Sequence, residues 1–382
     1  MDAKNVFKDK LAPLEGLTFD DLLLIPNYTD FKRQDVNLTA KLHPNLVLRL
    51  PVISAPMDTV TEAKMAAKLA VSGALGIIHR NLNVATQAQM VHKVKQAQVK
   101  DKKQACLDKK GRLLVGAAVG VGPDFQVRVK SLLKAQVDVI VVDSGHGHSK
   151  PVIEATQYLK KHHSTLPVVS GNVATYEGTK ALIEAGADVV KVGMGPGSIC
   201  TTRIIAGMGM PQLTAVAEAL RAAKPKKVPV IADGGVRQLG DIAKALALGA
   251  SAVMLGSLFS GFDESPGETV RVGGKQYKQY RGMGSVAAMK KGAAERYGQS
   301  RETDKKKLIS EGVESLVPYK GQVEDFLVQI EGSLRTSFYY LGSRTLSEFQ
   351  KKARFIRISN SGLSENHPHS LKILNAGGNY FL

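Results

Sequence analysis

Eight short apolar runs recur along the chain, and each of them ends in small or polar residues. Continuous apolar runs of this length are typical of parallel strands that are buried on both faces. Helical patterns separate several of them, for example at 178–185, 213–223 and 240–248. These strand–helix units predict a (β/α)8 TIM barrel, with a doubly wound sheet as the alternative. The runs are 51–54, 75–79, 113–119, 137–143, 167–172, 188–193, 228–233 and 251–256.

Polar residues gather where these runs end. In a barrel, the carboxyl ends of all strands meet at one face, and that face carries the active site. The turns after the seventh and eighth runs, 233–235 and 256–257, are rich in glycine and serine. Their backbone N–H groups suit a phosphate. The sequence therefore predicts a site at this face that binds a phosphorylated ligand.

The sixth run leads into a loop, residues 193–203, that reads Gly-Met-Gly-Pro-Gly-Ser-Ile-Cys-Thr-Thr-Arg. Glycines let a backbone approach a ligand closely and adopt positive φ. Backbone N–H groups around such a loop can polarise a cysteine toward the thiolate, its reactive form. The loop therefore favours Cys200 as a nucleophile over the alternative of a small buried thiol.

Composition narrows the class of protein. The chain has two cysteines, Cys106 and Cys200, so no disulfide framework is expected. Residues 1–16 lack the apolar core of a signal peptide, and no run is long enough to span a membrane. We expect a cytoplasmic protein without a membrane partner. The net charge of +18 favours a solvated basic surface that steers anionic substrates, with no dedicated nucleic-acid partner.

The domain organisation follows from the same pattern. Residues 1–382 are expected to form a single catalytic barrel domain. A long excursion after the eighth strand, 261–319, breaks the pattern, and excursions of this length are often functional lids. Within it we expect a mobile flap at 286–319. A polar tail at 363–382 follows the last helical pattern.

Several motifs together resemble the inosine-5′-monophosphate dehydrogenase family, over nearly the whole chain. They are 54–62, 143–148, 171–173, the Cys200 loop, 232–235, 280–285 and 365–367. The resemblance implies a (β/α)8-barrel homotetramer that oxidises IMP to XMP with NAD, the committed step toward guanine nucleotides.

The resemblance also implies roles for individual residues. Cys200 would attack C2 of IMP beside Thr202, and Arg296 with Tyr297 on the flap would activate the water that hydrolyses the adduct. A guanidinium is an unusual base, because it is almost always protonated. IMP would be held by a set of substrate-binding residues: Ser54, Met57, Ser198, Asp233, Gly235, Gly256, Ser257, Tyr280, Arg281, Gly282, Met283, Gly284 and Glu311.

Two further ligands follow from the resemblance. NAD would lie against Asp143, Ser144, Asn172, Gly193 and Gly195. A potassium ion would be held by backbone carbonyls of the cysteine loop and by the tail of a neighbouring subunit. The expected metal-binding residues are Gly195, Gly197, Cys200, Glu365, Asn366 and His367.

The chain departs from the family pattern in two places. A short lysine-rich linker at 93–112 stands where most family members carry CBS regulatory modules, so we expect those modules to be absent. Gly298 follows the Arg-Tyr pair, where the family commonly has an aromatic residue.

The main alternative is GMP reductase, which shares the barrel, the cysteine loop and the thioimidate. The Arg296-Tyr297 pair, the 280–284 motif and His367 favour the dehydrogenase. An inactive nucleotide-binding barrel and a basic nucleic-acid-binding protein are further alternatives. The intact Cys200, Thr202 and Arg296 argue against the first, and the missing recognition motifs argue against the second.

Overall fold

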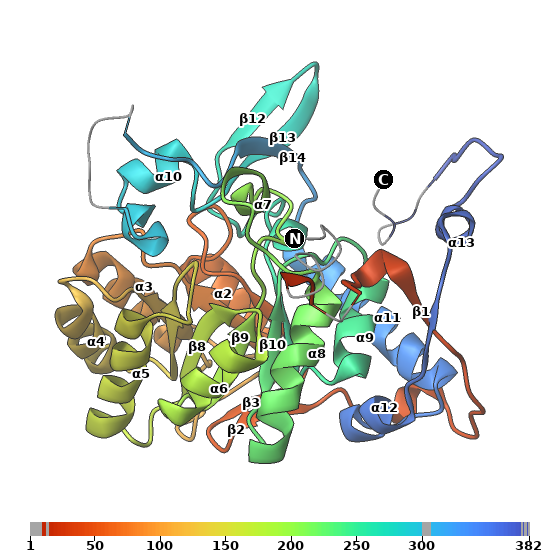
Figure 1. Ribbon diagram of the computed structural model, residues 1–382, viewed down its shortest axis with the longest axis horizontal. Coiled ribbons are helices and arrows are strands. Elements are labelled where there is room, and N and C mark those ends of the chain that lie inside the picture. The colour runs from red at the N-terminus through yellow and green to blue at the C-terminus, as the bar shows by residue number, and fades with distance from the viewer. Residues whose placement is uncertain (1–9, 13–14, 300–306, 376, 378–379, 381–382) are drawn as a thin grey trace, which may run out of the picture.

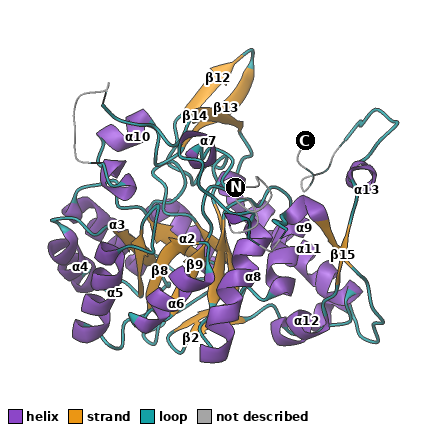
Figure 2. Ribbon diagram, in the orientation of Figure 1, coloured by secondary structure: helices purple, strands orange, loops and turns teal. Residues whose placement is uncertain are grey.

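The barrel expected from the sequence is present in the computed structural model, which describes residues 10–12, 15–299, 307–375, 377 and 380. All eight apolar runs form parallel strands that close in the order β10-β11-β4-β5-β6-β7-β8-β9, so the predicted fold class is confirmed (Figures 1 and 2). The strands are β4 (Val52–Ser54), β5 (Leu75–Ile78), β6 (Gly116–Val119), β7 (Val139–Asp143), β8 (Val168–Val173), β9 (Val189–Val192), β10 (Val230–Asp233) and β11 (Ala252–Leu255).

Helices surround the strands because each helix has one apolar face that packs against the barrel. Polar residues cap the N-termini of several helices. At one helix the Asn83 side chain accepts a hydrogen bond from the N–H of Thr86, and at another the Thr175 side chain accepts one from the N–H of Gly178. The helices of this outer layer are α2 (Ala63–Val71), α3 (Val84–Gln96), α4 (Phe125–Lys134), α5 (Lys150–His162), α6 (Tyr176–Glu184), α8 (Gln212–Ala223), α9 (Leu239–Leu248) and α11 (Val323–Tyr340).

One end of the barrel is plugged. The antiparallel pair β2 (Ala40–His43) and β3 (Leu46–Leu48) lies below the barrel in Figure 1. Leu46 and Leu48 are fully buried and belong to the same apolar cluster as Ile53 and other strand residues inside the barrel. With the amino ends of the strands filled by leucines, the open end is the carboxyl end.

The segment 93–112 lies at that plugged end. It leaves α3 and returns through a turn in which Asp108 accepts hydrogen bonds from the N–H groups of Lys110 and Arg112. Leu107 and Leu113 bridge in antiparallel fashion. The buried Lys95 binds Asp108 and Asp138, with Nζ–O distances of 3.1 Å and 2.5 Å.

The excursion after the eighth strand contains a sheet that the sequence analysis did not anticipate. β12 (Thr269–Val272), β13 (Lys275–Arg281) and β14 (Glu314–Pro318) form three antiparallel strands above the open end (Figure 1). Between β13 and β14 come α10 (Val286–Lys290) and the 3-10 helix η5 (Ala293–Tyr297). Residues 300–306 of the predicted flap lie outside the described residues.

The remaining elements complete the surface. β1 (Leu22–Leu24) pairs with β15 (Phe355–Arg357). This pairing connects a segment from the first part of the chain to one from its last part. No helix among the described residues has the length and apolar character required to cross a membrane. The other elements are the helices α7 (Thr202–Ile205), α12 (Leu346–Lys352) and α13 (Asn360–Glu365), and the 3-10 helices η1 (Phe19–Asp21), η2 (Arg33–Asp35), η3 (Lys224–Lys226) and η4 (Ser257–Phe259).

Candidate active site

A cleft of about 1060 Å³ opens at the carboxyl end of the barrel, between the strand ends and the excursion. Its lining comes from the loops after several strands, so residues that are far apart in the sequence share one cavity. The predicted site residues that line it are Met57, Ser144, Asn172, Gly193, Gly195, Gly197, Ser198, Cys200, Thr202, Asp233, Gly235, Gly256, Ser257, Tyr280, Gly282, Met283, Arg296, Tyr297 and Glu311.

The cysteine loop leaves β9 in a conformation that requires glycine. Gly193 has φ of 147°, and a Cβ there would lie 2.0 Å from the carbonyl oxygen of Asp233. The loop then folds on itself, where the Cys200 N–H donates to the Gly197 carbonyl at 3.0 Å. Cys200 is therefore held at the cleft, immediately before the short helix α7.

A chain of polar contacts begins at the Cys200 thiol. Its Sγ lies 3.2 Å from Oγ1 of Thr202, and that hydroxyl donates to Oε2 of Glu311 at 2.8 Å. The backbone fixes this geometry, because the Thr201 N–H donates to the Glu311 carbonyl at 3.0 Å. A proton can pass along such a chain between the thiol and the carboxylate.

The two cysteines differ in reactivity. Cys106 is buried, and burial raises the pKa of its thiol to about 11, whereas Cys200 is partly exposed in the cleft. The thiolate is the reactive form, and Cys106 forms it only as the pH rises toward that pKa. We expect iodoacetamide at pH 7.5 to alkylate Cys200 at least about 100-fold faster than Cys106.

Peptide mass spectrometry over a time course measures both alkylation rates in one sample. The denatured protein serves as the control, because both thiols are then exposed and should react at similar rates. Alkylation of folded Cys106 before Cys200 would contradict the expectation.

The 3-10 helix η5 docks on the barrel mouth. The Arg296 guanidinium forms an ion pair with the carboxylate of Asp143 at the end of β7, and the Arg296 carbonyl accepts from the N–H of Gly145 at 3.1 Å. Burial lowers the pKa of Arg296 below its usual value, although contact with Tyr297 opposes this effect. The ion pair with Asp143 also favours the charged guanidinium, so burial and ion pairing act on the docked arginine in opposite directions.

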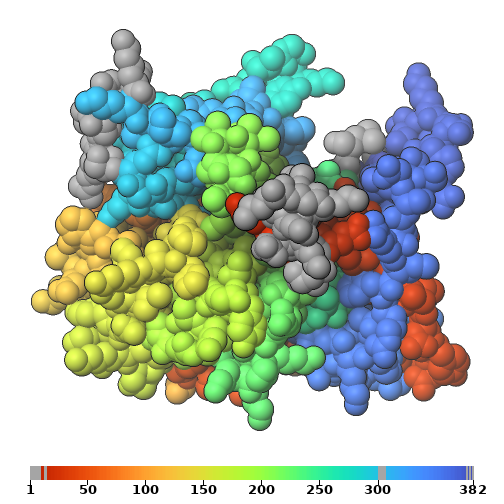
Figure 3. Space-filling view, in the orientation of Figure 1, coloured from red at the N-terminus to blue at the C-terminus, as the bar shows by residue number. Residues whose placement is uncertain are grey.

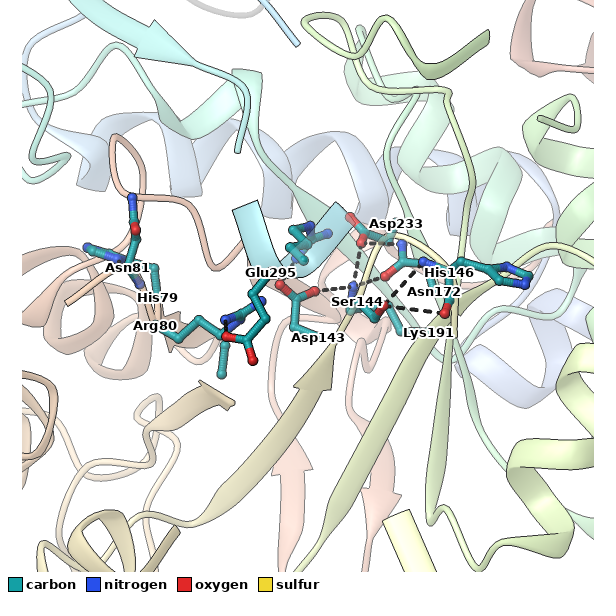
Figure 4. Close-up of polar contacts among 12 residues, drawn as sticks. His79, Arg80, Asn81, Asp143, Ser144, His146, Asn172, Lys191, Asp233 and Glu295 are labelled. Carbon is teal, nitrogen blue, oxygen red and sulfur yellow. Dashed lines mark hydrogen bonds and ion pairs between the residues drawn. The ribbon is translucent and has the colours of Figure 1, made fainter. Parts of the chain in front are cut away.

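A second ion pair joins η5 to the barrel. Oε2 of Glu295 lies 3.5 Å from Nη1 of Arg80, which follows β5 (Figure 4). Next to it on η5, burial raises the pKa of Tyr297, so its hydroxyl stays protonated. Two ion pairs thus attach the helix to the barrel, at the ends of β5 and β7.

The opposite wall of the cleft is formed by β13 and the loops after β4 and β11. Tyr280 is buried there, and this burial raises the pKa of its hydroxyl. A Cβ on Gly256 would lie 3.1 Å from that hydroxyl and 3.3 Å from Sδ of Met57. Three predicted substrate-binding residues therefore meet at one point.

Some predicted site residues do not reach the main cleft. The Ser54 hydroxyl is fully buried and accepts from Thr61 Oγ1 at 2.8 Å. Arg281 pairs instead with Asp58, where Nε and Nη2 lie 3.0 Å and 2.5 Å from the carboxylate oxygens. Gly284 lies behind the Tyr297 ring, and Asp143 lines a smaller cavity beneath η5.

The predicted tail ligands Glu365, Asn366 and His367 lie at the end of α13. In the space-filling view this part of the chain projects beyond the barrel, away from the loop around α7 (Figure 3). These residues are exposed. One copy of the chain therefore does not bring α13 and these three residues together with the cysteine loop.

Some residues that contact the site were not predicted from the sequence. Lys191 is the clearest of them: it is fully buried in β9 and bonds three predicted site residues. A lysine inside an otherwise apolar strand is a signal that could have revealed it. Arg80 and Glu295 gave no comparable signal, since charged residues are common at loop positions.

The fold and the site define a class: a (β/α)8-barrel protein with a candidate nucleophilic cysteine at the carboxyl end of its sixth strand. The sequence from residue 16 to residue 369 matches the family described as "IMP dehydrogenase / GMP reductase domain". The chain belongs to this family.

Proteins named inosine-5′-monophosphate dehydrogenase are similar over almost the whole chain. The one from Cryptosporidium parvum is 45% identical and covers 100% of both chains. Those from Aquifex aeolicus and Borreliella burgdorferi are each 41% identical, over 96% and 94% of this chain and 98% and 97% of their own.

Proposed function

We propose that the chain catalyses the NAD-dependent oxidation of IMP to XMP through a covalent adduct on Cys200. The observation that carries this proposal is the chain of contacts from Cys200 through Thr202 to Glu311, in a cleft that Arg296 enters from the flap. The relatives named inosine-5′-monophosphate dehydrogenase support the choice of substrate.

The first half of the reaction builds the adduct. IMP binds with its phosphate at the turns around Gly235 and Ser257 and its ribose hydroxyls at Asp233. The Cys200 thiolate attacks C2 of the purine and forms a C–S bond, and the hydrogen at C2 leaves with its electron pair as hydride. When bound, NAD supplies the acceptor for this hydride. A thioimidate remains on Cys200.

The second half hydrolyses the adduct. Arg296 and Tyr297 position a water molecule over C2. Once the Arg296 guanidinium has released a proton to solvent, the neutral guanidine takes a proton from the water as the C–O bond forms. The C–S bond then breaks, which releases XMP and returns the Cys200 thiolate. The lowered pKa of docked Arg296 supports this role, because a base must be able to exist briefly without its proton.

The residues predicted to bind NAD are all free to contact it only when η5 has moved away from them. Asp143 and the Gly145 N–H, at the predicted nicotinamide side, are bonded to Arg296 while the flap is docked. We therefore propose that the mobile flap and the cofactor occupy this side in turn, with Ser144, Asn172, Gly193 and Gly195 completing it.

One copy of the chain offers part of the coordination shell that a potassium ion needs. Carbonyls of a glycine-rich loop can replace the water shell of a large, weakly hydrated cation. The loop at Gly195, Gly197 and Cys200 offers such carbonyls. We propose that Glu365, Asn366 and His367 of a neighbouring copy complete the set in a homotetramer, since α13, at whose end they lie, is far from α7 and the cysteine loop in Figure 1.

We further propose that the 93–112 turn replaces the CBS modules in a single-domain cytoplasmic enzyme with a flap at 286–319 and a cation-binding tail at 363–382. The alignment with the Aquifex aeolicus protein spans 483 positions and covers 96% of the 382 residues here, so at least 101 of its positions have no residue of this chain. The alignment with the Cryptosporidium parvum protein spans only 409 positions. The longer relative thus carries residues without a counterpart in this chain, which supports the proposal.

Incubation with nucleotides tests the proposed function. We expect IMP and NAD to give NADH, followed at 340 nm, whereas GMP and NADPH give no loss of NADPH. The reductive reaction has no hydrolytic step and releases ammonia, so product analysis separates the two. NADPH consumption with GMP, without reaction of IMP and NAD, would replace the dehydrogenase by GMP reductase. No reaction with either pair, despite IMP binding, would indicate an inactive barrel.

A further inference from the structure

Lys191 is a charged residue where the fold expects an apolar one. It lies in β9 between Val190 and Val192, and its side chain is 0% exposed. Its neighbour strand passes very close: a Cβ on Gly171 would lie 2.8 Å from Cβ of Lys191, so glycine is required there. An ammonium ion buried this deeply is tolerated only when opposite charges and hydrogen bonds compensate it.

The compensating groups are all predicted site residues. Nζ of Lys191 donates to Asp143 Oδ1 at 3.1 Å, to Asp233 Oδ2 at 2.8 Å and to Oδ1 of Asn172 (Figure 4). Asn172 in turn donates from Nδ2 to Asp233 Oδ2 at 2.8 Å. The lysine therefore links the ends of β7, β8 and β10, which carry the predicted cofactor and substrate contacts.

The cluster has an uneven charge. Two carboxylates, Asp143 and Asp233, share the one ammonium of Lys191, which leaves one negative charge. When η5 is docked, the Arg296 guanidinium binds Asp143 and brings the cluster to neutrality. Asp143 is thus held between a fixed cation in the barrel and a cation carried by the flap.

We infer that Lys191 is a positioning residue that holds the carboxylates of Asp143 and Asp233 in place, so that one can receive Arg296 and the other the ribose of the nucleotide. This inference rests on the proposed function for the roles of those two carboxylates. An opposite charge within about 4–6 Å lowers the pKa of a carboxyl by roughly 1–3 units. Without Lys191, Asp143 would take up a proton at higher pH and would then bind Arg296 more weakly, and Asp233 would lose the ammonium that holds its carboxylate in place.

Other titratable groups face the same cluster. Arg80, Glu295 and Tyr297 lie on the flap side, and Cys200, Tyr280 and Glu311 on the substrate side. They remain in place when Lys191 is replaced. The effect of Lys191 on the pH dependence of turnover is therefore measured as a difference between variants, because a single pH profile contains the contributions of all these groups.

The test compares three variants by the pH dependence of steady-state turnover. Lys191→Met removes the charge, Lys191→Arg keeps it, and Lys95→Met is the matched control. Lys95 is also buried between two carboxylates, but at the plugged end of the barrel. We expect the acid limb of Lys191→Met to move up by roughly 1–3 pH units, while Lys191→Arg and Lys95→Met stay close to the wild type.

Calorimetry of IMP binding over the same pH range provides a readout that does not need turnover. The affinity of Lys191→Met should be lower than that of the wild type, because Asp233 has lost the ammonium that holds its carboxylate toward the ribose. If Lys191→Met does not fold at neutral pH, Lys191→Gln, which keeps a donor without the charge, replaces it in the same comparison.

A pH profile of turnover in Lys191→Met that matches the wild type would overturn the inference. An equal shift of the profile in Lys191→Arg would also overturn it, because it would show that side-chain geometry and not charge matters. A shift in Lys95→Met would assign the effect to general loss of stability, and it too would overturn the inference. A wild type that binds IMP without oxidising it would remove the proposed function, yet the binding comparison would still decide the role of Lys191.

Discussion

Replacing Cys200 by alanine should abolish NADH formation from IMP and NAD and leave IMP binding close to that of the wild type. The thiol forms the one covalent bond between protein and substrate in the proposed mechanism, so we expect turnover to fall by roughly 10⁴-fold or more. The phosphate and ribose contacts come from other loops, at Gly235, Ser257 and Asp233, and do not depend on the thiol.

Absorbance at 340 nm measures the loss of turnover, and calorimetry measures the retained binding. Cys106→Ala is the matched control: this thiol is buried at the plugged end of the barrel, where it donates to the Gly73 carbonyl at 3.0 Å. It should keep wild-type turnover. During wild-type turnover, mass spectrometry should find the nucleotide adduct on Cys200. Appreciable NADH from Cys200→Ala would rule out the nucleophile.

Replacing Arg296 by alanine should separate the two halves of the reaction. The arginine acts on the water after hydride has left, so the first turnover should give a near-normal burst of NADH. Steady turnover should then slow by about 10²–10⁴-fold, the usual contribution of a general base. The adduct on Cys200 should accumulate to the concentration of active sites.

Stopped-flow absorbance resolves the burst from the steady phase, and intact-protein mass spectrometry counts the adduct. Lys291→Ala is the control, because Lys291 is an exposed cation on the same excursion. Lys291→Ala should show neither the burst of NADH nor the slow steady phase expected of Arg296→Ala. An equal loss of the burst and of steady turnover in Arg296→Ala would show that the arginine serves an earlier step.

The barrel could be predicted from the sequence because its strands are buried on both faces and so read as continuous apolar runs. The sheet of β12, β13 and β14 gives no such signal. Its residues are largely exposed, and β13 pairs with β14 across the whole flap, as in the pair Arg281 and Glu314. A local pattern cannot report a pairing that depends on contacts so far apart in the chain.

The candidate site shows the same limit. Motifs around Cys200 and Asp233 were recognisable because strand ends of a barrel converge by construction. The orientation of single side chains is not encoded in a motif: Ser54 faces Thr61 in the interior, and Arg281 faces Asp58. The Arg296–Asp143 pair joins two segments that only the docked excursion brings together.

The docking of η5 on Asp143 and Gly145 has a thermodynamic consequence for cofactor affinity. A segment of the chain that occupies part of the cofactor site acts as an intramolecular competitor, and its local concentration does not change with dilution. The apparent dissociation constant is then the intrinsic one divided by the fraction of molecules whose site is open. If the site were open in about one molecule in ten, NAD would bind roughly tenfold more weakly than its contacts alone allow. If the cofactor binds as proposed, the strength of the Arg296 and Glu295 ion pairs thus sets its apparent affinity.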